Sequence, residues 1–331
     1  MTDPKQFYVA YLNILGCRCV FNQNPDKAKD LLDDIHAAFD TVTNIIECVQ
    51  RATLETSDYS HEEIPKLKAY RKVFSNEVLM CFEKTGDAFF DLNNLLAMAS
   101  IVADIQREFI LKYGISLGGC ISQGAFSIDE DFAFGRELVE TTSFEDFTQM
   151  PRIVFTAQIL QELSAIRPSL AMHELKWFYD SWLDELLFQD KDGQTILNYL
   201  YKANGLMLER TPFFAQVTTM MESRFPKTHG SVSKYSYGIR EVMDDHSNVI
   251  EGKLDAYGNY DDIDESQTQT AMKRLEVFRK YLWVADFHNS ICERNGLGEE
   301  FKIDVSTEDD NRFGLPRRKN AYWCSSSTSR A

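Results

Sequence analysis

Two asparagines interrupt apolar segments, and their side chains can do coordination chemistry if the fold brings them together. Asn13 follows the apolar run 7–12, and Asn76 lies at the junction of the apolar runs 70–75 and 77–82. Carboxylates at converging strand ends hold Mg²⁺ or Mn²⁺ through oxygen ligands, with phosphate oxygens completing the shell. Asparagine offers one neutral carbonyl oxygen of similar shape. A turn or capping role is the alternative for each residue.

The stretch after Asn13 is a candidate phosphate-binding turn. The backbone N–H groups of residues 14–17 can cradle a phosphate chain if the chain turns after the strand, which makes Leu15, Gly16 and Cys17 candidate contacts. One glycine is not a phosphate-binding loop, so an ordinary turn is the alternative.

A lysine and an aromatic residue lie just before Asn76. Lys72 precedes Asn76 by four residues. Because side chains alternate along a strand, Lys72 shares a face with Phe74. From that face the two side chains can reach a base or a phosphate. A solvated strand lysine is the alternative.

The first 160 residues alternate between strand and helix patterns. Strands are predicted for 6–15, 70–75, 77–82, 115–128 and from 151, and helices for 25–51, 91–112 and 135–147. Glycines punctuate the strand at 115–128, which predicts close backbone approach or bulges. The order predicts an α+β fold with a mainly antiparallel sheet and helices on one face, a class that includes the ferredoxin-like topology. In such a sheet the ends near Asn13 and Asn76 can converge.

From about residue 160 the pattern becomes mostly helical, as in "HELKWFYDSWLDELLFQ", "TILNYLYKA" and "TQTAMKRLEVFRKYLWVADFHNSICERN". The "DKDG" stretch at 190–193 looks like the start of a calcium loop, but its glycine comes too early and no glutamate ends it, so a turn is predicted. The expected organisation is a first domain at 1–165, a mostly helical region at 166–303 and a loose polar tail at 304–331.

Bulk properties exclude several classes of protein. The 331 residues carry a formal net charge of −16, whereas nucleic-acid binders have basic surfaces. No leader pattern and no run of 18 apolar residues are found, so no membrane span is expected. The seven cysteines are irregularly spaced and form no Cys-x-x-Cys pair. Free thiols in a reducing cytoplasm are therefore predicted.

Taken in order, "AYLNILG", "VFSNEVLMCF", "LGGCISQGAF", "FGRELVETTSFED" and "PRIVFT" resemble the catalytic domain of the class III-like nucleotide cyclases of the bacterial Pycsar anti-phage system. "DKDGQTILNYL", "HSNVIEGKL" and "RKYLWVADFHN" look like that family's C-terminal region, so the resemblance covers roughly 6–291. It implies the class III cyclase fold, with the catalytic domain at 1–165.

The resemblance also implies roles for individual residues. The family carries aspartate, its two metal-binding carboxylates, where this chain has Asn13 and Asn76. The residue after the first aspartate adds a backbone carbonyl to the metal, which here is Ile14. Lys72 corresponds in spacing to a base-contacting strand position of class III cyclases. Glu140 falls in a helix whose residues face the ribose in related cyclases.

The chemistry implied by the resemblance is intramolecular. The ribose 3′-oxygen of UTP or CTP attacks the α-phosphorus, pyrophosphate leaves, and cyclic UMP or cyclic CMP acts on a separate cyclic-nucleotide-binding effector. Two Mg²⁺ or Mn²⁺ ions per site activate the 3′-hydroxyl and hold the triphosphate. Class III sites form between two domains, so a homodimer is implied, without direct nucleic-acid or membrane binding.

Asparagine at both positions removes two formal charges while preserving shape, so we expect a low-activity or inactive form. Three explanations remain open: an engineered inactive form, a natural pseudo-cyclase, or a shifted alignment in which Glu77 or Asp87 does the work. A regulatory nucleotide-sensing dimer is the rival from another class. A diguanylate-cyclase-type or palm-like domain is a weaker rival, and the former's Gly-Gly-Asp/Glu-Glu-Phe hairpin is missing from the sequence.

Overall fold

The structure, a computed structural model, falls into two compact units. The first comprises Met1–Gln189 and Thr195–Ile239, and the second Asp190–Gln194 and Arg240–Ala331. The domain boundary predicted at residue 165 stays a prediction. The structure describes residues 5–16, 29–37, 40, 68–74, 76–128, 133–134, 150–169, 176–201, 239–258 and 268–305.

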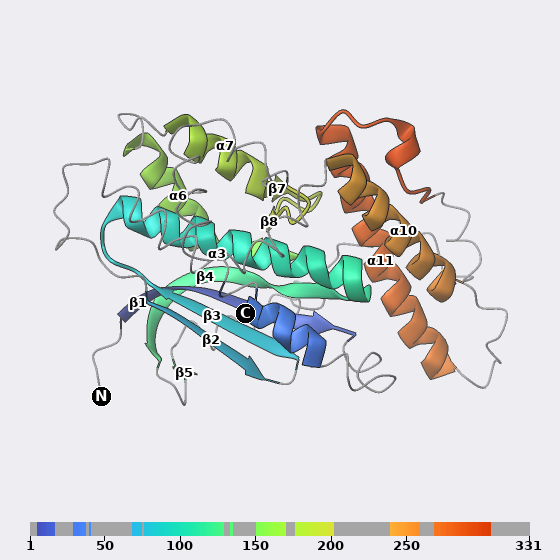
Figure 1. The fold of residues 1–331 in the computed structure, drawn as a ribbon, viewed down its shortest axis with the longest axis horizontal. Helices are drawn as coiled ribbons and strands as arrows, with labels where there is room; N and C mark the ends of the chain where they lie inside the picture. Colours follow the sequence, from blue (N-terminus) through green and yellow to red (C-terminus); the bar gives the residue numbers. More distant parts are fainter. Residues whose placement is uncertain are drawn as a thin grey trace, which may run out of the picture. The chain divides into compact units, whose positions relative to one another are not determined.

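A mixed sheet forms the centre of the first unit (Figure 1). Its strands are β1 (Lys5–Leu15), β2 (Ala69–Phe74), β3 (Glu77–Glu83), β4 (Ser116–Ile128), β5 (Ala133–Phe134), β6 (Ile153–Phe155), β7 (Leu187–Gln189) and β8 (Thr195–Leu197). The order is β2-β3-β1-β4-β6-β8-β7, and β5 pairs with β4. Among the described strands only β4 and β6 pair in parallel, which confirms the mainly antiparallel sheet.

Strand β1 lies between β3 and β4 and is buried on both faces. On one face Phe7, Val9 and Tyr11 pack with an apolar cluster of β3 and β4 residues, namely Leu79, Cys81, Cys120 and Phe126. On the other face Tyr8 is fully buried, as are Ala10 and Leu12. A strand covered on both sides has a nearly continuous apolar sequence, which explains the run 7–12.

Helix α3 (Ala88–Glu108) packs against β1, β3 and β4, and α6 (Ala157–Ser169) and α7 (Lys176–Leu186) lie beside it on that face (Figure 1). A π-helical turn, Phe109–Tyr113, extends α3 to Gly114, whose φ of 59° and N–H bond to Ile110 end the helix. This confirms the helix predicted at 91–112. Within 25–51, residues 29–37 are helical, and the helix predicted at 135–147 lies outside the described residues.

Two short strands lie inside the range predicted to be mostly helical. Helix α7 ends at Leu186, and β7 and β8 then pair as a hairpin around the "DKDG" stretch. The predicted turn is present: Asp190 N–H donates to the Gln194 carbonyl, and Gly193 has a φ of 83°. Because β8 also pairs with β6, sheet pairing overrides the local helical pattern of "TILNYL".

The second unit is built on two antiparallel helices, α10 (Ile239–Gly258) and α11 (Thr268–Arg294), followed by a 3₁₀ turn, η6 (Glu299–Phe301). The rings of Tyr257 and Tyr281 stack, and Arg274 donates to the Ala256 carbonyl, so the two helices are in contact. In the same unit Asp190 accepts a hydrogen bond from Trp283 Nε1 (3.2 Å), and Lys191 pairs with Asp286 (2.8 Å).

None of the described helices combines the length and apolarity needed to cross a bilayer. Cys81, Cys120 and Cys292 are free and buried. Burial raises the pKa of the Cys81 and Cys120 thiols to about 12, so both stay protonated at neutral pH.

Candidate active site

The end of β1 and the tip of the β2–β3 hairpin meet at the two asparagines. Asn76 Nδ2 donates to Asn13 Oδ1 (2.6 Å), and the Ile14 N–H donates to the Asn76 carbonyl oxygen (2.7 Å). Both asparagines are half-buried. The structure therefore brings the two asparagines together, as expected for residues at the ends of neighbouring strands. Their catalytic and metal-binding roles stay predictions.

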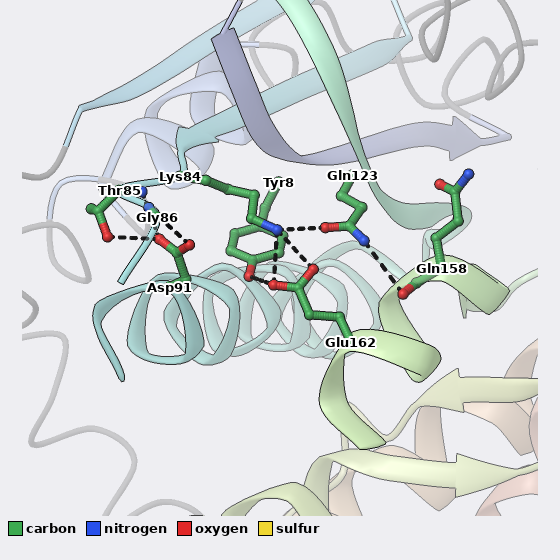
Figure 2. Close-up of polar contacts among 8 residues, drawn as sticks. All are labelled: Tyr8, Lys84, Thr85, Gly86, Asp91, Gln123, Gln158 and Glu162. Atoms are coloured by element: carbon green, nitrogen blue, oxygen red, sulfur yellow. Dashed lines mark hydrogen bonds and ion pairs between the residues drawn. The ribbon is translucent and has the colours of Figure 1, made fainter. Parts of the chain in front are cut away.

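A single row of residues crosses the sheet at this point. Phe74 on β2 is paired with Glu77 on β3, which is paired with Asn13 on β1, which is paired with Gly118 on β4. Directly paired residues share a sheet face, and Asn13 shares the face of Tyr11 because the two are two residues apart on β1. The row therefore lies on the face opposite Tyr8 and α3 (Figure 2). Phe74 is 51% exposed, and Gly118 adds no side chain to the row.

Lys72 lies two residues before Phe74 on β2, opposite Leu79. By alternation it shares the face of Phe74 and Asn13, as predicted. The predicted contact of Lys72 with a base stays a prediction.

The backbone after Asn13 only partly fits a phosphate cradle. Leu15 ends β1, and Gly16 follows with a φ of 80°, a left-handed conformation that turns the chain. This confirms a turn at the predicted place. The N–H of Ile14, however, is bonded to Asn76, so it is not available to a phosphate. Cys17 and Glu140 lie outside the described residues.

The side chains at the meeting point do not fit a pair of divalent ions. Two neutral amides stand where two carboxylates would offset the metal charge, and the amide N–H of Asn76 points at the oxygen of Asn13. Glu77 is the one carboxylate in the row. Within the described ranges no three His, Cys, Asp or Glu side chains are grouped to hold a metal ion.

Sequence reasoning did not place Gly118 and Glu77 beside Asn13. Their positions depend on strand register, which joins residues far apart in sequence. The glycines of β4 were the available signal, since they predicted a close backbone approach. At Gly119 this is confirmed: a Cβ there would lie 2.1 Å from the Tyr11 carbonyl oxygen.

A second polar cluster lies on the α3 face of the sheet (Figure 2). Lys84 Nζ contacts both carboxylate oxygens of Glu162 at 2.8 Å and Gln123 Oε1 at 2.7 Å, and it lies over the Tyr8 ring. The Tyr8 hydroxyl donates to Glu162. Burial, and then Glu162, raise the pKa of Tyr8 far above its usual range. The donors and acceptors of this cluster bond to one another, so we assign it a role in stabilising the fold.

The Lys84 cluster makes a testable prediction. Lys84→Met keeps the apolar stem but leaves the Glu162 carboxylate, whose side chain is 17% exposed, without its cation. We expect a loss of about 2–3 kcal/mol in the free energy of unfolding, measured by denaturant titration. Adding Glu162→Gln should recover part of it, because Tyr8 can still donate to the amide oxygen.

Lys5→Met is the matched control for this prediction. Lys5 pairs with Glu83 at the surface, where its side chain is 50% exposed and solvent screens the pair, so the expected loss is much smaller than for Lys84→Met. Equal losses for the Lys5 and Lys84 variants would show that the Lys84 cluster contributes no special stability.

Comparison with known proteins assigns no family. No family model and no curated protein sequence matches the chain. Among solved structures, the adenylyl cyclase CyaB from P. aeruginosa aligns over 60% of this chain and 96% of its own, at 12% identity and a TM-score of 0.33. A likeness at this score does not support an assignment.

Proposed function

We propose that the first unit is a nucleotide cyclase domain of the Pycsar type, whose substrate is UTP or CTP and whose product, cyclic UMP or cyclic CMP, is an anti-phage second messenger. One observation carries the proposal. The hydrogen bond between Asn76 and Asn13 joins a strand end to a hairpin tip at the two positions where the resembled family has metal-binding aspartates.

We further propose that the chain as written cyclises its substrate slowly or not at all. The triphosphate and its leaving pyrophosphate need strong positive charge nearby, and neutral amides hold divalent cations weakly. Each 1.36 kcal/mol of lost transition-state stabilisation slows a reaction about tenfold. Losing two carboxylates can therefore remove measurable activity without changing the fold.

A non-catalytic nucleotide-binding role is the second candidate. The favouring observation is that the two amides satisfy each other directly, so the meeting point of β1 and the hairpin needs no metal to hold it together. In this role Phe74, which is exposed on the same face, offers a ring on which a base can stack. A separate cyclic-nucleotide-binding effector belongs to the cyclase proposal alone, whereas a homodimer fits both candidates.

The cyclase proposal is tested by restoring the charges. The variant Asn13→Asp/Asn76→Asp is incubated with Mn²⁺ and each of the four nucleoside triphosphates. The products are separated by chromatography and identified by mass spectrometry. We expect cyclic UMP or cyclic CMP from the double variant and at most a trace from either single variant. The cyclase proposal fails if the folded double variant forms no cyclic product from any triphosphate.

Nucleotide binding by the chain with Asn13 and Asn76 unchanged distinguishes the two candidate functions. Thermal unfolding is followed with UTP or CTP in the presence of a metal chelator. A non-catalytic binder is expected to be stabilised by nucleotide under these conditions. If stabilisation appears only with divalent metal, and only in the double variant, the cyclase proposal stands and the non-catalytic role is excluded.

A further inference from the structure

Two buried histidines and a cysteine form a cluster in the second unit, whereas the candidate active site belongs to the first unit. Nδ1 of His246 on α10 lies 3.0 Å from Nδ1 of His288 on α11, and the two rings stack with an interplanar angle of 3°. Both residues are 0% exposed. The Sγ of Cys292, one turn along α11, lies 3.5 Å from His288 Nε2.

The hydrogen bonds of the cluster determine where its protons lie. His288 Nε2 is 2.7 Å from the Phe301 carbonyl oxygen, which can only accept, so Nε2 carries the proton. A neutral imidazole has one N–H, so His288 Nδ1 is an acceptor and His246 Nδ1 donates to it. The arrangement leaves no room for a proton on His288 Nδ1, and burial disfavours a charge on His246. Two protonated rings would place N–H against N–H and two cations 3.0 Å apart.

Burial and the facing rings disfavour a charge on the pair. On α10 its neighbours in the core are Met243 and Ile250. Burial lowers the pKa of His246, as does the facing His288. Burial also lowers the pKa of His288, although its bond to the Phe301 carbonyl acts in the opposite direction.

The charged groups near the cluster are arranged around η6. Lys302 pairs with Glu293 and Glu299, and these three act on Cys292 rather than on the histidine rings. Arg240 lies over the Phe301 ring, 5.7 Å from its centroid. The segment after η6 is also held by Asn289, which exchanges two hydrogen bonds with Ile303 that do not depend on pH.

We propose that His246 and His288 form a pH-sensitive clamp, which holds α10, α11 and η6 together while both rings are neutral and releases them as the pH falls. The direction follows from linkage. An unfolded or opened histidine takes up a proton near pH 6.5, whereas the closed pair resists protonation. The stabilisation is therefore complete above about pH 6.5 and is lost as the pH falls toward the lower pKa values of the closed pair.

Cys292 reports the opening, because its thiol is buried in the cluster. The full chain is treated with a low concentration of 4,4′-dithiodipyridine, which reacts with thiols at acid pH, and modification of each cysteine is measured by mass spectrometry. Cys81 and Cys120 in the first unit are internal references for global unfolding. If both histidines protonate on opening, the Cys292 rate relative to Cys81 rises up to about 100-fold between pH 7.5 and 5.5.

Variants separate the clamp from a general acid effect. His246→Asn keeps a donor near the Nδ1 position but cannot titrate, so the rise should fall to about tenfold. His36→Gln, which removes an exposed histidine of the first unit, should leave the rise unchanged. The proposal is overturned if the ratio in the chain as written changes less than threefold, or if His246→Asn keeps the full rise.

Discussion

In metal-free buffer the variant Asn13→Asp/Asn76→Asp is expected to unfold more easily than the chain as written. The amide N–H of Asn76 now contacts the Asn13 oxygen at 2.6 Å, and the double variant replaces that contact with two carboxylates. Even if the carboxylates move apart to about 4 Å, two like charges cost about 4 kcal/mol at an effective dielectric of about 20. Denaturant titration with a chelator present measures the loss, which should shrink near pH 4, where one carboxyl takes up a proton.

Divalent metal is expected to reverse this loss in the double variant and to have little effect on the chain as written. A cation between the carboxylates removes their repulsion, and binding to the folded state stabilises it by mass action. Asn13→Asp alone is the control, because the Asn76 amide can still donate to the new carboxylate. A double variant that is as stable as the chain as written without metal would contradict the proposed geometry.

Gly119→Ala is expected to destabilise the protein strongly, although it adds only one methyl group. The new Cβ would lie 2.1 Å from the Tyr11 carbonyl oxygen and 3.0 Å from the Leu12 Cα, both backbone atoms of β1. Strand β1 must therefore shift against β4, at a cost of about 3 kcal/mol. Because Asn13 follows on the same strand, the ligand response of the active site should change as well.

Gly252→Ala provides the opposite control for Gly119→Ala. Gly252 lies within α10, and nothing stands within 4 Å of the position of its Cβ. Alanine in a helix interior is favoured over glycine by about 0.5–1 kcal/mol, so this variant should be slightly more stable. Calorimetry of both variants checks the contrast. Similar thermal midpoints would show that the contact at Gly119 relaxes easily.

The strands around the site were predictable because their sequence patterns are local. The apolar run of β1 ends at Asn13, and the two runs around Asn76 form the hairpin β2–β3 in the predicted order. Gly114 marks the end of the long helix because only glycine adopts its φ readily. Convergence of the two asparagines followed from these elements and a choice of neighbouring strands.

The rest of the site required information that is not local. Gly118 and Glu77 lie beside Asn13 through pairing across 105 and 64 residues, and a shift of one residue would place them on the other face. The strands β7 and β8 were missed because each has three residues, too few to show a period of two. Their pairing with β6 and with each other depends on the assembled sheet.

The turn between β7 and β8 has a consequence for dividing the protein. Residues 190–194 belong to the second unit although the strands on either side belong to the first. Asp190 and Lys191 are bonded to Trp283 and Asp286 on α11. The chain therefore enters the second unit twice, and no single cut separates the units as complete modules. A fragment that ends before α10 would lose the partners of that turn, so truncation experiments need the full chain as reference.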